Sequence, residues 1–220
     1  MSKKSARRTP GRAEKRRAGV AQEILEAARQ QLMEPGTDGL RLDAVARKLG
    51  LTKAALYYYY PSKEALVFAV VLDELTALAA SCHAATEAAV DGPAAIEVLI
   101  RSIVAHWATR LNAFRIVTGV PQGRDGVHVL TPAHLALIHP LNDRMFGPTE
   151  RKLKADIQRG RIPPHSNPRR LAFAAQAAAL GLLTMKAMVE SVNDPLGHGD
   201  EPLTRELCLA FRAAAEKGTP

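Results

Sequence analysis

The chain has 220 residues, of which 47% are hydrophobic and only 5% aromatic, and its formal net charge is +8. Ala and Leu supply most of the apolar residues, and because these are strong helix formers, the composition predicts an all-α protein. The two cysteines, Cys82 and Cys208, are too few for a disulfide framework, and no window holds the roughly 18 uninterrupted apolar residues of a membrane span. The basic N-terminus has no apolar run behind it, so we expect a soluble, cytoplasmic chain with no secretory signal.

The surplus of positive charge is confined to the first third of the chain. Residues 1–63 contain 14 of the 30 Lys and Arg residues but only 6 of the 22 Asp and Glu residues, whereas residues 64–220 contain 16 of each sign. A polyanion such as DNA or RNA would be attracted to this end through its charge and through counterion release. A solubilising tail is the alternative, and charge alone favours neither.

The N-terminal residues divide into a basic arm and a first helix. The arm, MSKKSARRTPGRAEKRR, carries eight basic side chains and no apolar face, which predicts disorder over residues 1–17. From Val20 to Leu32 apolar residues recur at helical spacing, and Pro35-Gly36 predicts the end of this helix.

Two short helices and one long helix are predicted next. Residues 42–49 form one apolar face and precede Gly50, a residue suited to the left-handed conformation that closes a helix. Thr52 can cap a helix over 53–59, and Ser62 can cap a long helix that continues into the middle eighties. Two short helices joined by a tight glycine turn, with another helix packed across them, are typical of a helix-turn-helix. The second helix of such a pair lies in the major groove of DNA.

The rest of the chain is predicted to be helical between clear breaks. The expected helices run from Asp91 to about Asn112, from Thr131 to Arg159 with interruptions near Pro140 and Pro148, from Pro168 to about Val192 and from about Pro202 to Lys217, with a loop over 119–132. We find no internal repeat and no strand pattern. Residues 65–220 are therefore expected to form a larger helical domain.

The stretch 42–66, LDAVARKLGLTKAALYYYYPSKEAL, resembles the DNA-binding domain of the TetR family of bacterial repressors. The resemblance rests on Leu49-Gly50-Leu51-Thr52, on Leu56-Tyr57 and on Pro61-Ser62-Lys63-Glu64 at these spacings, and it extends over roughly residues 18–80. It implies an N-terminal three-helix DNA-binding domain over 18–64 and a helical effector-binding and dimerisation domain over 65–220.

Residues around the short helices are the predicted DNA contacts. Thr52 and Lys53 stand at the N-terminus of the groove helix, where backbone amides favour phosphate, and Ala54 is small enough to touch a thymine methyl. Lys63 is expected to reach a phosphate on the same side. Arg41 takes the place where the family usually has a capping Thr or Ser, and we expect it to contact a phosphate or, as the alternative, a base edge.

The four consecutive tyrosines, residues 57–60, are divided between the DNA and the core. Tyr60 is expected in the core, because the family usually has a buried Phe there, and Tyr57 is a candidate for partial burial. Tyr58 and Tyr59 are the preferred DNA-facing pair, while the phenols of Tyr57 and Tyr58 are both suited to phosphate oxygens. The basic arm would follow phosphates or enter the minor groove.

The two C-terminal helices are the predicted dimer interface. By resemblance, helices at about 168–192 and 202–217 would pack with their copies in a four-helix bundle of a homodimer. The segment 171–183 supports this independently, since it is apolar almost all round and needs cover on more than one face, although a buried core helix has the same pattern. A two-fold dimer would read a near-palindromic operator.

The candidate effector pocket is drawn from large or polarizable side chains on the middle helices. They are Cys82, His83, His106, Trp107, Phe114, Met145, Phe146, Phe173 and Met185. Such a mixture suits a small, mostly apolar ligand with one or two polar groups, and an ordinary core position is the alternative for each. Trp107 and Phe114, seven residues apart on one helical face, are the preferred pair.

No cofactor, metal or catalytic site is expected. His128, His134 and His139 lack ligand spacing, no His-Glu-x-x-His pattern occurs, and there is no glycine-rich phosphate loop or nucleophile elbow. The sequence therefore predicts a DNA-binding transcriptional regulator and not an enzyme. We expect a ligand-responsive repressor, a homodimer that a small effector releases from DNA; the alternatives are an activator on the same fold and a helical scaffold that binds RNA or protein through its basic arm.

Overall fold

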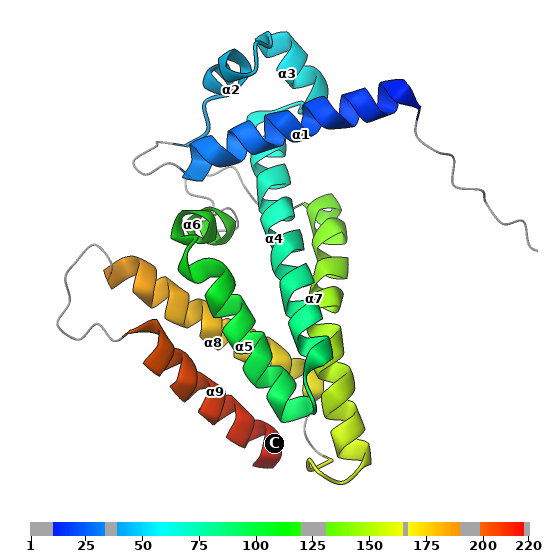
Figure 1. Ribbon diagram of the computed structural model, residues 1–220, viewed down its shortest axis with the longest axis vertical. Coiled ribbons are helices and arrows are strands. Elements are labelled where there is room, and N and C mark those ends of the chain that lie inside the picture. Colours follow the sequence, from blue (N-terminus) through cyan, green and yellow to red (C-terminus); the bar gives the residue numbers. More distant parts are fainter. Residues whose placement is uncertain (1–10, 34–38, 120–130, 165–166, 190–198, 218–220) are drawn as a thin grey trace, which may run out of the picture. The chain divides into compact units, whose positions relative to one another are not determined.

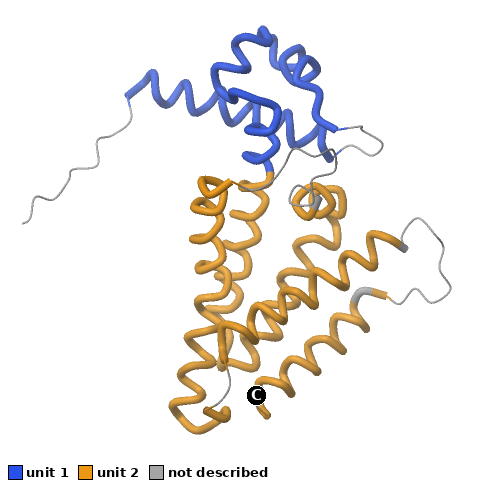
Figure 2. Tube along the Cα trace, turned by 180° about the vertical axis from the view of Figure 1, so that it is seen from behind, with its two compact units in different colours: residues 1–70 blue, residues 71–220 orange. Residues whose placement is uncertain are grey.

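A computed structural model describes residues 11–33, 39–119, 131–164, 167–189 and 199–217, and within these ranges the secondary structure is entirely helical. The helices (Figure 1) are α1 Arg12–Met33, α2 Leu42–Lys48, α3 Lys53–Tyr59, α4 Lys63–Ala88, α5 Gly92–Ala108, α6 Leu111–Gly119, α7 Pro132–Gln158, α8 Pro168–Val189 and α9 Asp200–Lys217. The predicted all-α class is confirmed. The chain divides into two compact units, residues 1–70 and 71–220 (Figure 2), so the division falls inside α4, six residues beyond the expected end of the first domain at 64.

The core of the first unit is assembled from one apolar face of each of its helices. α1 contributes Ile24 and Ala28, both fully buried, and α3 and α4 contribute Leu56 and Leu66, also fully buried. Burying a Leu or Ile side chain stabilises the fold by about 1.5–3 kcal/mol, so this small cluster is the main source of stability for the unit.

The turn between α2 and α3 forms as the sequence predicts. Gly50 has a φ of +64°, in the left-handed region that glycine adopts without a steric penalty, and the amide of Leu51 donates to the carbonyl of Ala46 at 2.9 Å. The Thr52 hydroxyl then accepts from the amide of Ala55 at 3.1 Å and caps α3. The Ser62 hydroxyl accepts from the amide of Ala65 at 3.0 Å in the first turn of α4.

The basic arm differs from its prediction where the structure describes it. α1 begins at Arg12, eight residues before Val20, so the segment 12–17 is helical and not disordered, whereas residues 1–10 lie outside the described ranges. Apolar spacing detects only the part of a helix that faces a core. The first residues of α1 are good helix formers without such a face, and Glu14 accepts a hydrogen bond from the amide of Gly11 at 2.9 Å.

The second unit is built around α5, which packs against α7, α8 and α9. Ile96, Leu99, Ile100 and Ile103 of α5 are fully buried. The predicted helix over 91–112 is in fact two helices, because α5 ends at Ala108 and α6 begins at Leu111. At the break the amide of Arg110 bonds the carbonyl of Trp107 at 2.8 Å, which is a tight turn and not a helical bond.

α7 is continuous through Pro140 and Pro148, so the predicted interruptions are wrong. A proline inside a helix costs about 3 kcal/mol, because it removes one amide donor and crowds the preceding turn. Burial offsets this cost at Pro148, which is itself buried next to Met145 and Phe146, in a helix that packs on α5 and α8.

The starts of α8 and α9 lie close to the predicted positions. The Asn167 side chain accepts from the amide of Arg170 at 2.9 Å, as expected for a cap before Pro168. α9 begins at Asp200, slightly before the expected 202, and residues 190–192 of the expected preceding helix lie outside the described ranges.

Two described helices, α4 and α8, are long and apolar enough to cross a membrane by length and composition. Core helices of water-soluble proteins pass the same test, and the apolar windows of α4 and α8 are 44% and 28% buried within this single chain. α8 therefore exposes an unusual amount of apolar surface for a helix of a monomer.

Candidate nucleic-acid interface

The exposed face of α3 gathers most of the side chains predicted to contact DNA. Leu56 is fully buried and fixes which side of the helix faces the core. Thr52, Lys53 and Ala54 at the start of the helix are exposed, as is Tyr57 one turn later. This face presents hydroxyls, a cation and a small apolar side chain together, a combination that suits phosphates and base edges.

The four tyrosines differ from the prediction in which of them are exposed. Tyr57 and Tyr58 are exposed, at 40% and 65% of their surface, whereas Tyr59 packs partly buried against the core of the unit. The exposed pair is thus Tyr57 with Tyr58, and not Tyr58 with Tyr59. The expected core position of Tyr60 is confirmed, since its hydroxyl donates to the carbonyl of Ala21 at 3.2 Å and burial raises its pKa.

Tyr58 also contacts α1, which the sequence analysis did not foresee. The guanidinium carbon of Arg17 lies 4.9 Å from the centre of the Tyr58 ring, and the rings of Tyr58 and Tyr59 meet edge to face at 5.3 Å. A cation over an aromatic face is attracted by the ring quadrupole. Tyr58 is therefore held between the first helix and the core while most of its surface stays exposed.

The remaining cations lie at helix starts around the same unit. Lys53 Nζ is 3.1 Å from Asp43 Oδ1, and this hydrogen bond and its charge raise the pKa of Lys53, which keeps the ammonium protonated. Arg41 is the N-cap residue of α2 and its side chain makes no cap hydrogen bond; its amide donates to Gln31 Oε1 at 3.1 Å. Lys63, the first residue of α4, is exposed.

The candidate effector residues of the second unit fall into separate groups. Trp107 and Phe114 pack edge to face at 5.9 Å and both are buried, with His106 against Trp107 at 4.6 Å. Buried Phe146 meets Phe173 at 6.4 Å, although Phe173 is 62% exposed. The other members, Cys82 and Met145, are buried, His83 contacts the carbonyl of Arg144 at 3.1 Å, and Met185 is 57% exposed. Among the described residues they form two aromatic pairs, Trp107 with Phe114 and Phe146 with Phe173.

A charged cluster that the sequence did not reveal lies next to Trp107. Glu74 of α4 is buried, and its Oε2 is 3.4 Å from Arg110 Nη1 and 4.0 Å from His106 Nε2. Burial lowers the pKa of His106 and the charge of Arg110 lowers it further, which favours the neutral imidazole. The buried atoms His106 Nε2 and Trp107 Nε1 have no hydrogen-bond partner among the described residues.

His106 also borders a shallow groove between α4 and α5. The groove has a volume of about 480 Å³ and is lined by Ser81, Val98, Arg101, Ser102, Ala105 and His106. Its lining is a mixture of small apolar side chains, two hydroxyls, one imidazole and the guanidinium of Arg101, so it combines space with hydrogen-bonding groups.

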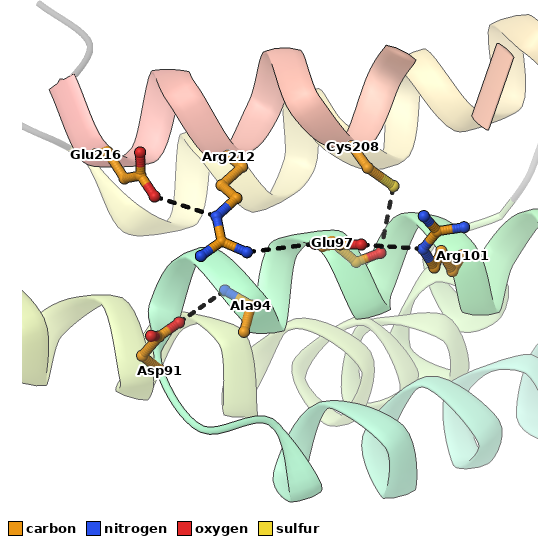
Figure 3. Close-up of polar contacts among 7 residues, drawn as sticks. All are labelled: Asp91, Ala94, Glu97, Arg101, Cys208, Arg212 and Glu216. Atoms are coloured by element: carbon orange, nitrogen blue, oxygen red, sulfur yellow. Dashed lines mark hydrogen bonds and ion pairs between the residues drawn. The ribbon is translucent and has the colours of Figure 1, made fainter. Parts of the chain in front are cut away.

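Polar contacts fasten α9 to α5 (Figure 3). The Glu97 carboxylate lies between two arginines, with Oε1 3.1 Å from Arg101 Nε and Oε2 3.6 Å from Arg212 Nη1. The Cys208 thiol donates to the backbone carbonyl of Glu97 at 3.7 Å. Burial raises the pKa of Cys208, and that of Cys82 to about 12, so both thiols stay protonated at neutral pH. With one side of α9 held in this way, Leu209 on another side is 56% exposed.

Among the described residues, no group of three or more His, Cys, Asp and Glu side chains is placed to hold a metal ion. His134 instead takes part in a capping box with Thr131 at the start of α7. His128 lies outside the described ranges.

Comparison with known proteins matches residues 24–70 to the family model for bacterial regulatory proteins, tetR family. The HTH-type transcriptional regulator Rv1816 of Mycobacterium tuberculosis is 32% identical over 93 residues, which are 42% of this chain and 40% of that protein. The matched part of the chain thus spans less than half the length of this relative. The resemblance seen in residues 42–66 is confirmed, and the matched relative is a transcriptional regulator.

Solved structures extend the likeness of fold to nearly the whole chain. A bacterial regulatory protein in the tetR family from Rhodococcus RHA1 has a TM-score of 0.63 and 19% identity, with 91% of this chain and 98% of that one covered. The transcriptional regulator FadR from Bacillus subtilis, solved in complex with stearoyl-CoA, has a TM-score of 0.63 and 14% identity, with 90% and 99% covered. At these identities the likeness shows the fold, including that of the second unit.

Proposed function

We propose that this chain, which belongs to the tetR family of bacterial regulatory proteins, is a ligand-responsive repressor of transcription that binds a near-palindromic operator as a homodimer. The single observation that carries the proposal is the face of α3, where Tyr57 and Tyr58 stand exposed beside Thr52 and Lys53 on a helix whose other side is locked by Leu56. The protein would act in the cytoplasm, where its DNA is found.

α3 would be the recognition helix, the helix that lies in the major groove and contacts the bases. Thr52 and Lys53 would bind phosphate at the start of α3, and the exposed Ala54 would contact a thymine methyl group. The hydroxyls of Tyr57 and Tyr58 would donate to phosphate oxygens. Arg41 and Lys63 would hold the flanking backbone, since both are exposed at the starts of neighbouring helices. These contacts position the helix, and base contacts supply the sequence preference.

The apolar surfaces of the last two helices support a homodimer through α8 and α9. Phe173, Met185 and Met188 of α8 are 57–62% exposed, and Leu209 of α9 is 56% exposed. Small residues between them, such as Ala177 and Gly181, are also exposed and permit close approach of a second helix. A copy of the same two helices would cover these faces, and a two-fold axis would place the recognition helices about 34–36 Å apart, one turn of DNA.

The effector would bind in the second unit. The groove beside His106 offers the hydroxyls of Ser81 and Ser102 next to the apolar side chains of Val98 and Ala105, which suits a small and mostly apolar ligand. FadR, which shares this fold, is a transcriptional regulator solved with stearoyl-CoA, a ligand with a long apolar chain. The other predicted pocket residues do not line this groove, and their part in effector binding stays a prediction; they are His83, Phe114, Met145, Phe146 and Phe173.

Repression would be relieved by linkage between the effector site and the DNA site. A ligand that binds better to a state whose recognition helices are wrongly spaced shifts the population away from DNA. α4 is the connecting element, because it is one helix that begins at Lys63 in the first unit and carries Glu74 in the second.

The test is a selection of genomic duplex fragments on the purified full chain at about 150 mM salt, near physiological ionic strength. The wild type is compared with Tyr58→Ala/Lys63→Ala and with the control Arg144→Ala/Lys154→Ala, which removes exposed side chains from the second unit. We expect the wild type and the control to recover a near-palindromic site that the first variant loses. Enrichment of nothing beyond random fragments would reject the proposal and favour a scaffold that binds through its basic arm.

A further inference from the structure

α7 contains a backbone carbonyl without its usual helical donor. Pro148 lies inside this helix and is buried, and a proline has no amide hydrogen. The donor that is missing at Pro148 is the one that the carbonyl of Arg144, four residues earlier, would accept in a regular helix. This carbonyl is therefore free to accept a hydrogen bond from another part of the chain.

His83 of α4 supplies that donor. Its Nδ1 lies 3.1 Å from the carbonyl oxygen of Arg144, although the two residues are 61 positions apart. A carbonyl oxygen can only accept a hydrogen bond, so the contact requires the imidazole proton on Nδ1. His83 thus connects α4 to the point of α7 where the proline interrupts the helical bonding.

A second contact joins the same two helices one turn further along α4 (Figure 1). Glu87, four residues after His83, pairs with Arg151 of α7. Gly147 leaves room for this pair, because a Cβ at its position would lie 3.3 Å from Arg151 Nη1, closer than an ordinary contact. His83 and Glu87 therefore fasten one face of α4 to residues 144–151 of α7, and we call these two contacts the α4–α7 clasp.

The clasp fixes the orientation of α4 more than it adds stability. His83 and Glu87 keep 37% and 45% of their side-chain surface exposed, and exposed polar contacts contribute little to the free energy of unfolding. Apolar packing is non-directional, whereas a hydrogen bond weakens steeply when its angle changes. α4 is one continuous helix from Lys63 to Ala88, so a rotation at the clasp turns the whole helix, including its start in the first unit.

We propose that His83 is a positioning residue for operator binding: by donating to the carbonyl that Pro148 leaves free, it holds α4 in the orientation that spaces the two recognition helices of a dimer for the two halves of the operator. The inference rests on the proposed function and adds to it the contact that orients α4. Without the clasp, α4 takes other orientations, and the apparent affinity falls with the fraction of dimers whose spacing is correct. A single recognition helix needs no such spacing, so binding to one half-site does not depend on the clasp.

The test compares operator and half-site affinities of the full-length protein. The probes are the near-palindromic duplex selected as above and a duplex that contains one half of it. His83→Leu removes the donor, and we expect it to weaken operator binding about tenfold if the correctly spaced fraction falls to about a tenth. Its half-site affinity should stay within about twofold of the wild type, because the recognition helix itself is unchanged.

Two further variants separate the hydrogen bond from the loss of the ring. His83→Asn places an amide donor near the position of Nδ1 and should recover most of the operator affinity. His139→Leu is the matched control, since His139 is an exposed histidine of α7, and it should bind like the wild type. Circular dichroism checks that each variant keeps its helix content.

Pro148→Ala tests whether the proline is the reason for the contact. An alanine returns an amide donor to the carbonyl of Arg144, so in this background His83→Leu should weaken operator binding by less than about threefold. Nitrogen-15 NMR of the wild type is an independent measurement that needs no variant. We expect the neutral imidazole of His83 to carry its proton on Nδ1.

Four results would overturn the inference while leaving the proposed function intact. They are a neutral His83 protonated on Nε2, wild-type operator binding by His83→Leu, equal losses on operator and half-site, and an undiminished effect of His83→Leu in the Pro148→Ala background. Equal losses would show a general effect on the fold and not on the spacing of the recognition helices. If the wild type binds no duplex, the proposed function fails, and the positioning role fails with it.

Discussion

Different kinds of contact order the chain inside each of the two units. In the first unit, the turn between α2 and α3 and the start of α3 depend on residues close in sequence. Gly50 takes a positive φ in the turn, and the Thr52 hydroxyl caps α3 by accepting from an amide three residues away. In the second unit the polar ties join distant segments: the Asp156 carboxylate accepts from the amide of Gly92, 64 residues away, and Arg101 bonds Glu201, 100 residues away. The comparison teaches that local signals define the turn and the helix starts of the DNA-binding unit, whereas the polar ties of the larger unit are long-range.

The same comparison applies to the functional residues, and the chain carries a separate reporter for each unit. The candidate DNA contacts are exposed side chains on a motif, while the effector candidates are mostly buried or scattered. All four tyrosines are residues 57–60 in the first unit, and the single tryptophan is Trp107 in the second. Tyrosine and tryptophan fluorescence can therefore follow the unfolding of the two units separately.

The largest expected effect is that of Leu56→Ala in the first unit. Leu56 is fully buried among α1, α2 and α4, so its truncation leaves a cavity and should lower the free energy of unfolding by about 3 kcal/mol. Denaturant titration followed by tyrosine fluorescence measures this change. Arg47→Ala, at an exposed position of the same unit, should change it by less than about 0.5 kcal/mol.

The unfolding midpoint followed by Trp107 fluorescence tests whether the two units are stabilised separately. If the units are stabilised separately, Leu56→Ala should leave the Trp107 midpoint in place. An equal shift of both midpoints would show that the units unfold together through the shared helix α4, and the division into a local and a long-range unit would then fail for stability.

Asp156→Ala is the corresponding change in the second unit. The Asp156 carboxylate is buried, accepts from the amide of Gly92 at 2.7 Å and also pairs with Arg161. Its removal leaves a buried donor without an acceptor, which should cost about 2 kcal/mol and shift the tryptophan midpoint but not the tyrosine midpoint. Asp143→Ala removes an exposed carboxylate that pairs with Arg169 and serves as the control. Equal effects of the two substitutions would contradict a role for the long-range tie.

Most helix starts and turns of the first unit can be predicted from the sequence, and the features that it does not predict have identifiable causes. The caps at Thr52 and Ser62 and the left-handed Gly50 follow from residue types alone. Tyr59 was misassigned although a signal existed: it lies three residues after the buried Leu56 and therefore shares its helix face, whereas Tyr57 and Tyr58 do not. The start of α1 was missed because its first turns carry no apolar face.

In the second unit the sequence predicted the helices but not the contacts between them. No local pattern connects Glu74 with Arg110, or Asp156 with Gly92, because these pairs are 36 and 64 residues apart. Pro148 is a helix breaker by its chemistry, and only its burial in the folded unit makes a continuous α7 understandable. The apolar pattern of 171–183 was found, but which of its faces is covered within the chain becomes clear only from the packing on α5.

A smaller effect is expected from Thr52→Ala, which tests the local character of the first unit. Loss of the hydroxyl that accepts from the Ala55 amide should cost about 1 kcal/mol in the tyrosine-detected transition, and Thr52→Ser should restore most of it. A result in which Ser and Ala are equally destabilising would mean that the methyl group, and not the cap, is what matters at this position.

The smallest expected effect is a pH dependence of the second unit caused by His106. Burial and the charge of Arg110 lower the pKa of His106 in the folded state, so below its ordinary value of 6.5 the unfolded chain binds more protons at this site. The free energy of unfolding detected by Trp107 should therefore decrease as the pH falls from 7 through 6.5 toward 5, and part of this decrease should disappear in His106→Gln. His83→Gln, at a more exposed histidine, should keep the wild-type slope. If instead the wild type gains stability over this range relative to His106→Gln, the nearby carboxylate of Glu74 outweighs burial, and the cluster acts as an ion pair that strengthens on protonation.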